Sequence, residues 1–103
     1  MSGADDDLGG WALPAFKPDE AIQTLRRELR ALGLTEREGR FERRGTAIAR
    51  AAVDGTVIQA ARVKRPSRGS PEWIAKTLKH SGDVRNFVAD LKKQLAAWSH
   101  DDD

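Results

Sequence analysis

The chain has 103 residues, of which 39% are hydrophobic and 33% are charged. This length suits one domain with a single core, and the composition is far from that of disordered proteins. The absence of cysteine excludes disulfides, thiolate metal sites and cysteine nucleophiles. The first residues lack the features of a signal peptide, and no apolar run approaches a membrane span. We therefore expect a cytoplasmic protein with no membrane partner.

The positive charge is concentrated in the middle of the chain. The formal net charge is +2, from 18 Lys and Arg against 16 Asp and Glu. Six of these acids form two triplets, Asp5–Asp7 and Asp101–Asp103, which leaves ten acids against all 18 basic residues in between. This basic body favours association with a polyanion.

The first predicted regular element is a helix over residues 19–32. Residues 1–16, which contain several glycines and a proline, are expected to form an arm that precedes it. Pro18-Asp19-Glu20 suits a helix start, and Gly33 suits its C-terminal cap. Apolar residues then follow at helical spacing, at Ile22, Leu25, Leu29 and Leu32.

Two glycine turns predict a three-stranded antiparallel meander. Arg44-Gly45 separates residues 40–43 from 46–53, and Asp54-Gly55 separates the latter from 56–64. Two-residue turns fix which side chains share a face of the sheet. The bulkier face, interrupted by Arg50 and Gln59 and expected to meet the helices, carries Phe41, Ile48, Ala52, Val57, Ala61 and Val63.

The second predicted face is small and apolar, which is unusual for a surface in water. It carries Ala47, Ala49, Ala51, Val53, Ile58 and Ala60. Three explanations remain open: the N-terminal segment covers this face, a second subunit covers it, or a β-bulge changes the register.

Residues 71–98 are expected to be helical, either as one broken helix or as two. Ser70-Pro71-Glu72 suits a helix start, with Trp73 on its inner face. Gly82 suits its end, after which Asp83 or Ser81 caps a restart. The predicted fold class is therefore α+β: a helix, a three-stranded antiparallel meander, and one broken or two consecutive C-terminal helices on one sheet face. Residues 17–99 form the domain, and 100–103 an acidic tail.

This predicted order resembles that of double-stranded-RNA-binding domains and of small toxin domains with the same topology. The resemblance covers roughly residues 19–98 and is one of topology alone. Where those RNA binders have a lysine cluster, this chain has Ser70-Pro71-Glu72-Trp73. The resemblance therefore implies no role for individual residues.

Little in the sequence suggests catalysis. The two histidines, His80 and His100, lie at a predicted helix end and in the tail, with no spacing that suggests a triad. Glycine-rich phosphate loops are absent, and His80 with Asp83 gives only two ligands. We expect no enzymatic activity, no metal and no cofactor.

The leading hypothesis is a small non-enzymatic domain that binds nucleic acid, DNA or RNA, or another polyanion. Its contacts would come from the meander and its exit, at Arg40, Arg43, Arg44, Arg62, Lys64, Arg65 and Arg68. The alternative hypothesis is a protein-interaction or homodimerisation domain. Its interface would be the alanine-rich sheet face, at Ala49, Ala51, Ile58 and Ala60.

Overall fold

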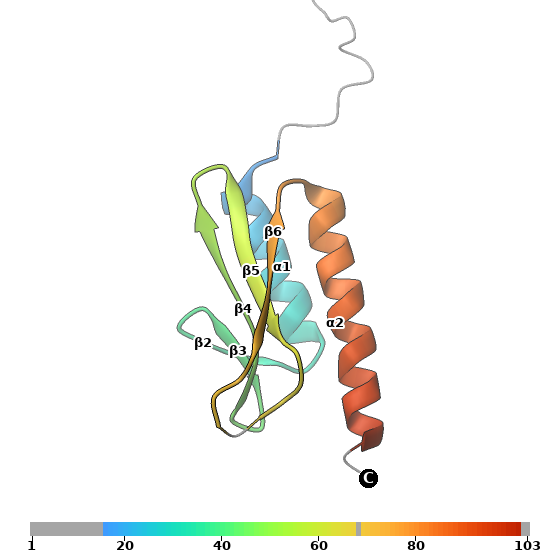
Figure 1. Cartoon of the computed structure of the whole chain (residues 1–103). Coiled ribbons are helices and arrows are strands. Elements are labelled where there is room, and N and C mark those ends of the chain that lie inside the picture. Colours follow the sequence, from blue (N-terminus) through green and yellow to red (C-terminus); the bar gives the residue numbers. More distant parts are fainter. Residues whose placement is uncertain (1–15, 68, 102–103) are drawn as a thin grey trace, which may run out of the picture.

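The protein is an antiparallel sheet of five strands with a helix before it and a helix after it. The structure is a computed structural model and describes residues 16–67 and 69–101. The strands follow one another in space as in the chain, in the order β2-β3-β4-β5-β6 (Figure 1). The elements are α1 (Pro18–Ala31), β2 (Thr35–Arg37), β3 (Arg40–Arg43), β4 (Thr46–Asp54), β5 (Val57–Val63), β6 (Trp73–Leu78) and α2 (Ser81–Asp101).

The predicted three-stranded meander is wrong, because one further strand lies at each edge of the sheet. The first is β2, which pairs with β3 through a tight turn at Glu38-Gly39. Both turn residues have positive φ, 51° at Glu38 and 81° at Gly39. Such a turn matches the right-handed twist of the two strands it joins. A glutamate before the glycine is a weak turn signal, so the sequence pattern did not reveal this hairpin.

The second additional strand is β6, where a helix was predicted. The stretch between Pro71 and Gly82 is shorter than the roughly 12 residues at which an isolated helix becomes stable. Trp, Ile and Thr also favour strands, and β5 offers a full row of backbone partners. Pairing therefore runs from Ile58 with Leu78 to Val63 with Trp73. This outcome also removes the topological resemblance to double-stranded-RNA-binding domains, which rested on three strands.

One continuous helix, α2, follows β6. The Lys79 N–H donates to Asp83 Oδ2 at 2.8 Å, so the predicted helix start near Asp83 is confirmed. His80 precedes this helix, whereas it was expected to end one, and Gly82 lies within the first turn. Neither α1 nor α2, in the part of the chain that the structure describes, has both the length and the apolar composition to cross a membrane.

A β-bulge in β4 decides which side chains face the helices. Phe41 lies opposite Ala49 whereas the next residue, Glu42, lies opposite Ala47, so Ile48 is an extra residue in β4. Ile48 and Ala49 are both fully buried. The third explanation of the small apolar face is therefore correct: a bulge shifts the register and places Phe41 on the same face as that set.

The face that the helices cover is the alanine-rich one, so the predicted facing of β4 and β5 is wrong. Ala49, Ile58 and Ala60 are buried against leucines of α1 and α2, including Leu25, Leu29, Leu91 and Leu95. Small side chains on the sheet allow the helices to approach closely. The predicted bulkier set loses Ala52, Val57, Ala61 and Val63, which by strand alternation lie on the opposite face of the sheet, called the outer face below.

The turn between β4 and β5 also differs slightly from the prediction. Asp54 still pairs with Val57, so the two turn residues are Gly55-Thr56, with φ of 64° at Gly55. The shift moves each partner by two positions. Because side chains alternate with a period of two, it leaves their facing unchanged.

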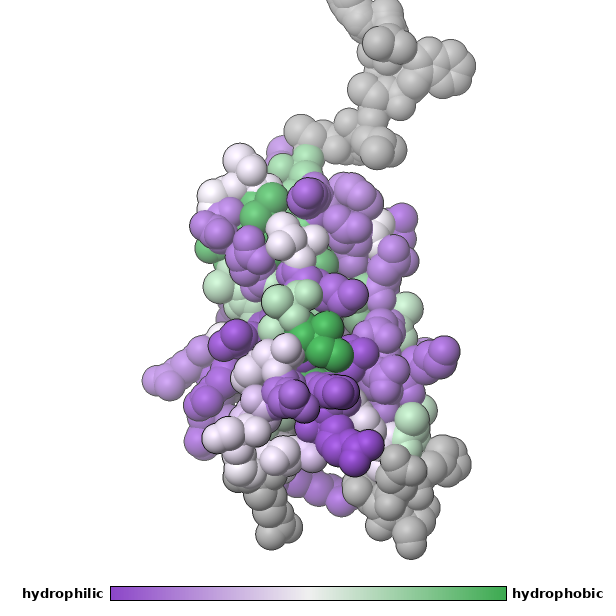
Figure 2. Space-filling view, viewed as in Figure 1, coloured by the Kyte–Doolittle hydropathy of each residue, from purple (hydrophilic) through white to green (hydrophobic). Residues whose placement is uncertain are grey.

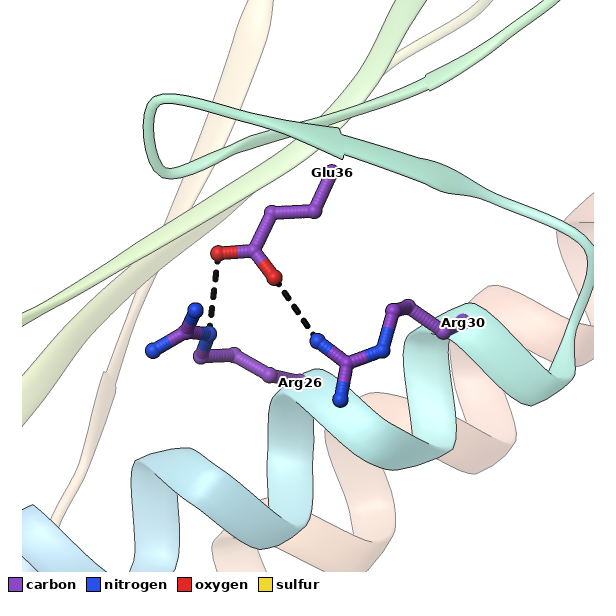
Figure 3. Close-up of polar contacts among 3 residues, drawn as sticks. All are labelled: Arg26, Arg30 and Glu36. Carbon is purple, nitrogen blue, oxygen red and sulfur yellow. Dashed lines mark hydrogen bonds and ion pairs between the residues drawn. The ribbon is translucent and has the colours of Figure 1, made fainter.

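An ion-pair cluster attaches the β2–β3 hairpin to α1 (Figure 3). Glu36 lies between two arginines of α1, 2.8 Å from Arg26 Nε and 2.9 Å from Arg30 Nη1. The Arg30 contact is a hydrogen bond, whereas the Arg26 Nε–H makes only the ion pair. Arg26 and Arg30 are therefore paired with a carboxylate, on the side of the sheet that the helices cover.

Replacing Ile58 by Ala tests the observed facing. Ile58 is fully buried in the core, so truncation should lower the free energy of unfolding by about 2–5 kcal/mol. Val57, which the predicted facing placed toward the helices, lies half-buried on the outer face, and Val57→Ala should cost less than about 1 kcal/mol. Urea unfolding followed by circular dichroism measures both. Equal, small losses would contradict the assigned core.

Candidate polyanion-binding groove

A groove of about 980 Å³ lies on the outer face. It lies between the β3–β4 turn and the connector that joins β5 to β6, which come together at one end of the sheet (Figure 1). Strands β3, β4 and β6 supply its remaining wall. Its lining residues are Arg40, Glu42, Arg43, Arg44, Gly45, Thr46, Ala47, Ile48, Arg50, Pro66, Ser67, Gly69, Pro71 and Trp73.

Three arginines lie directly opposite one another across the outer face. Arg40 of β3 pairs in register with Arg37 of β2 on one side and with Arg50 of β4 on the other. All three are exposed, and we call them the arginine row. Directly opposed residues on neighbouring strands have Cα atoms only about 4.5–5.5 Å apart. Like charges at this spacing repel and destabilise the sheet.

The arginine row exists only because of the bulge. In the register predicted from the two turns, Arg40 and Arg50 belonged to opposite faces. Because Ile48 is an extra residue, the side-chain alternation of β4 beyond it is reversed relative to β3. Arg40 and Arg50 therefore both lie on the outer face. Arg50 was not a predicted site residue, and a bulge inside an alanine-rich strand leaves no signal in the sequence.

Arg50 is stacked on Trp73, the one aromatic side chain among the described residues that line the groove. Its guanidinium carbon lies 4.7 Å from the centre of the Trp73 ring. Such a cation–π contact contributes about 0.5–2 kcal/mol, depending on its exposure to water. Trp73 was expected on the inner face of a helix. As part of β6 it is half-buried on the outer face instead, opposite Val63.

The remaining basic residues of the groove come from the β3–β4 turn. Arg44 has a positive φ of 55°, which the two-residue turn with Gly45 requires. Arg43 donates to Ser99 Oγ of α2 at 3.1 Å. Among the described residues of the lining, four arginines accompany one carboxylate, that of Glu42.

The opposite wall belongs to the connector between β5 and β6. The Lys64 N–H donates to the Glu72 carbonyl at 2.9 Å, which closes the neck of this loop. Within the loop, the Gly69 N–H donates to Ser67 Oγ. Lys64 and Arg65 are exposed in the connector but do not line the groove, and Arg68 lies outside the described residues.

One predicted contact residue lies on the wrong side of the sheet. Arg62 points toward α2, where its Nε lies 2.5 Å from Asp90 Oδ2, and its Nη1–H donates to the Val63 carbonyl. Its side chain is only 13% exposed. Arg62 is therefore held against a carboxylate and attaches α2 to the sheet. The structure thus brings three of the seven predicted residues, Arg40, Arg43 and Arg44, into one groove.

The alanine-rich surface proposed for a protein interface is inside the molecule. Ala49 and Ile58 are fully buried, Ala60 is 3% exposed, and Ala51 packs against the same core. The helices cover this face, so it offers no surface to a second subunit. The first explanation, cover by the N-terminal segment, involves residues 1–15, which lie outside the described residues.

The surface of the molecule is mixed in character on the side that Figure 2 draws. Figure 2 shows one side of the molecule, where hydrophilic side chains predominate and hydrophobic ones form small separate patches. Among the described residues, no group of three His, Asp or Glu side chains is placed to hold a metal ion. Comparison of the chain with models of protein families, with curated proteins and with solved structures finds no match.

Removing the central charge of the arginine row should stabilise the protein. Arg40→Gln relieves repulsion from both neighbours, so we expect the free energy of unfolding to rise by about 0.2–1 kcal/mol at low salt. The gain should disappear near about 1 M salt, where the screening length falls to about 3 Å. The matched control is Lys92→Gln on α2, which has uncharged residues three and four positions away on both sides. A loss of stability at low salt would contradict the repulsion.

Proposed function

We propose that this protein is a small, non-enzymatic binding domain for nucleic acid or another polyanion, and that the groove is its contact surface. The observation that carries the proposal is the arginine row. Arg37, Arg40 and Arg50 share one open face, and no carboxylate of the described residues forms an ion pair with them.

The electrostatics of the row support an anionic ligand. Three cations at neighbouring register positions cost stability in the free protein. A phosphate placed between them converts this repulsion into attraction and releases counterions from the ligand. Arginine suits the task because its planar guanidinium binds phosphate oxygens in pairs.

The arrangement of the charges also favours an extended ligand over a single small anion. Arg44, at the β3–β4 turn, continues the positive surface from the row to the end of the hairpin. Farther along the outer face the positive charge ends, because uncharged and acidic side chains take its place. Thr77 donates to Gln59 at 3.0 Å, and Gln59 donates to Asp54 at 3.5 Å. A polyanion would therefore follow one end of the face rather than spread across it.

Binding of a labelled oligonucleotide tests the proposal. An oligonucleotide of about 16 nucleotides suits a compact single-strand-binding domain and is short enough for fluorescence anisotropy. Between about 50 and 200 mM salt, affinity should fall steeply. The double variant Arg40→Gln/Arg44→Gln should bind at least about tenfold more weakly, and its salt slope should drop by roughly 1.5–2.

The matched control is Lys92→Gln/Lys93→Gln, which removes the same charge from the exposed side of α2. It should bind nearly as well as the unmodified protein. Equal weakening by both double variants would show that net charge alone attracts the ligand and would contradict the groove. Absence of binding at the lower salt concentration to DNA, RNA and heparin would contradict the proposal as a whole.

A further inference from the structure

We propose that the ligand of the groove is single-stranded nucleic acid, and that an unpaired base stacks on the Arg50–Trp73 pair. This inference rests on the proposed function and narrows it to one substrate class. It follows from three features of the groove: where the stacked pair lies, what surrounds it, and which surface it offers.

Both members of the stacked pair line the groove. Arg50 and Trp73 project from the outer faces of β4 and β6, between the β3–β4 turn and the connector. A strand that follows the arginines of the row and turn therefore passes over the pair. Backbone contacts and a stacking surface are the two elements that single-strand-binding grooves combine.

Small residues neighbour the pair on the outer face. Arg50 lies opposite Ala61, which in turn lies opposite Ala75, two residues along the strand from Trp73. Ala47 lies nearby in the lining of the groove. Ala61 is only 2% exposed, so the methyl groups that a planar ligand can reach near the pair are those of Ala75 and Ala47. An apolar surface of this kind is complementary to the face of a base.

The chemistry of the pair matches a base better than it matches a phosphate alone. The guanidinium of Arg50 lies over the Trp73 ring, and a guanidinium group can donate from its edge to phosphate oxygens and stack on an aromatic ring through its face. Bases stack on arginine planes as well as on aromatic rings, and they do so with little sequence preference. In a duplex the bases are stacked on each other and only phosphates and base edges are exposed, so this surface would stay unused.

The experiment compares one sequence as a single strand and as a duplex, in DNA and in RNA, with a heparin fragment as a polyanion that has no bases. Stacking contributes about 1–3 kcal/mol per base. The single strand should therefore bind roughly 5- to 150-fold more tightly than the duplex at equal salt. Because the comparison uses the unmodified protein, it does not depend on whether any variant folds.

Two charge-conserving variants locate the effect. Arg50→Lys keeps the charge but removes the planar group, so it should weaken single-strand binding about tenfold and leave duplex and heparin binding unchanged. Arg40→Lys is the matched control in the same row and should affect all three ligands alike and weakly. Stacking should also change the fluorescence of Trp73. The Trp73→Phe variant, which keeps only Trp11 and Trp98, shows how much of the observed change comes from Trp73.

The outcomes distinguish this inference from the function on which it rests. Equal affinity for single strand, duplex and heparin, with Arg50→Lys and Arg40→Lys behaving alike, would overturn the stacking inference and leave a polyanion-binding groove. Tighter binding of the duplex would overturn it as well. Absence of binding to every ligand would overturn both proposals.

Discussion

The β-bulge at Ile48 is the constraint on which the rest of the molecule depends. One extra residue in β4 allows Ile48 and Ala49 to be buried side by side while Phe41, on the neighbouring strand, remains in the same core. Without it, the alternation of β3 would place Phe41 on the outer face whenever Ala49 faced the helices. The bulge thus reconciles the apolar pattern of the β3 strand with that of β4 and β5, and it fixes the face on which α1 and α2 pack.

The same residue creates the candidate site as a consequence of packing. Once Ala49 and Ala51 face the helices, Arg50 between them must face outward, in register with Arg40 and, through it, Arg37. The repulsion within this row is modest compared with burial of the core, because exposed charges are screened by water and salt. A fold with a strong core tolerates such a row, and an anionic ligand relieves it. Basic residues that support the fold, Arg26, Arg30 and Arg62, are on the other side and are paired with carboxylates.

The site was predictable from the sequence only where its residues belong to a local turn. Arg43 and Arg44 directly precede the glycine of a hairpin turn, so their placement at one end of the sheet followed from the turn itself. Arg62 was assigned to the site because it is basic and close to the exit of the sheet. Its actual partner, Asp90, is 28 residues away in the chain, and such a contact has no local signature. Arg50 and Trp73 were missed because one depends on a bulge and the other on the pairing of β6 with β5.

The sequence alone determined the helix that begins at Pro18, the hairpin at Arg44-Gly45, the start of the last helix and the excess of positive charge in the body of the chain. Each of these depends on neighbours within a few residues, such as a proline at a helix start or a glycine with positive φ. Only the tertiary structure decided that residues 73–78 are a strand, that the alanine face is the core, and that Arg50 lies beside Arg40. In all three cases the deciding contacts come from partners distant in the chain. β6 pairs with backbone groups of β5, the alanines pack against leucines of both helices, and Arg50 is placed by the register of a neighbouring strand.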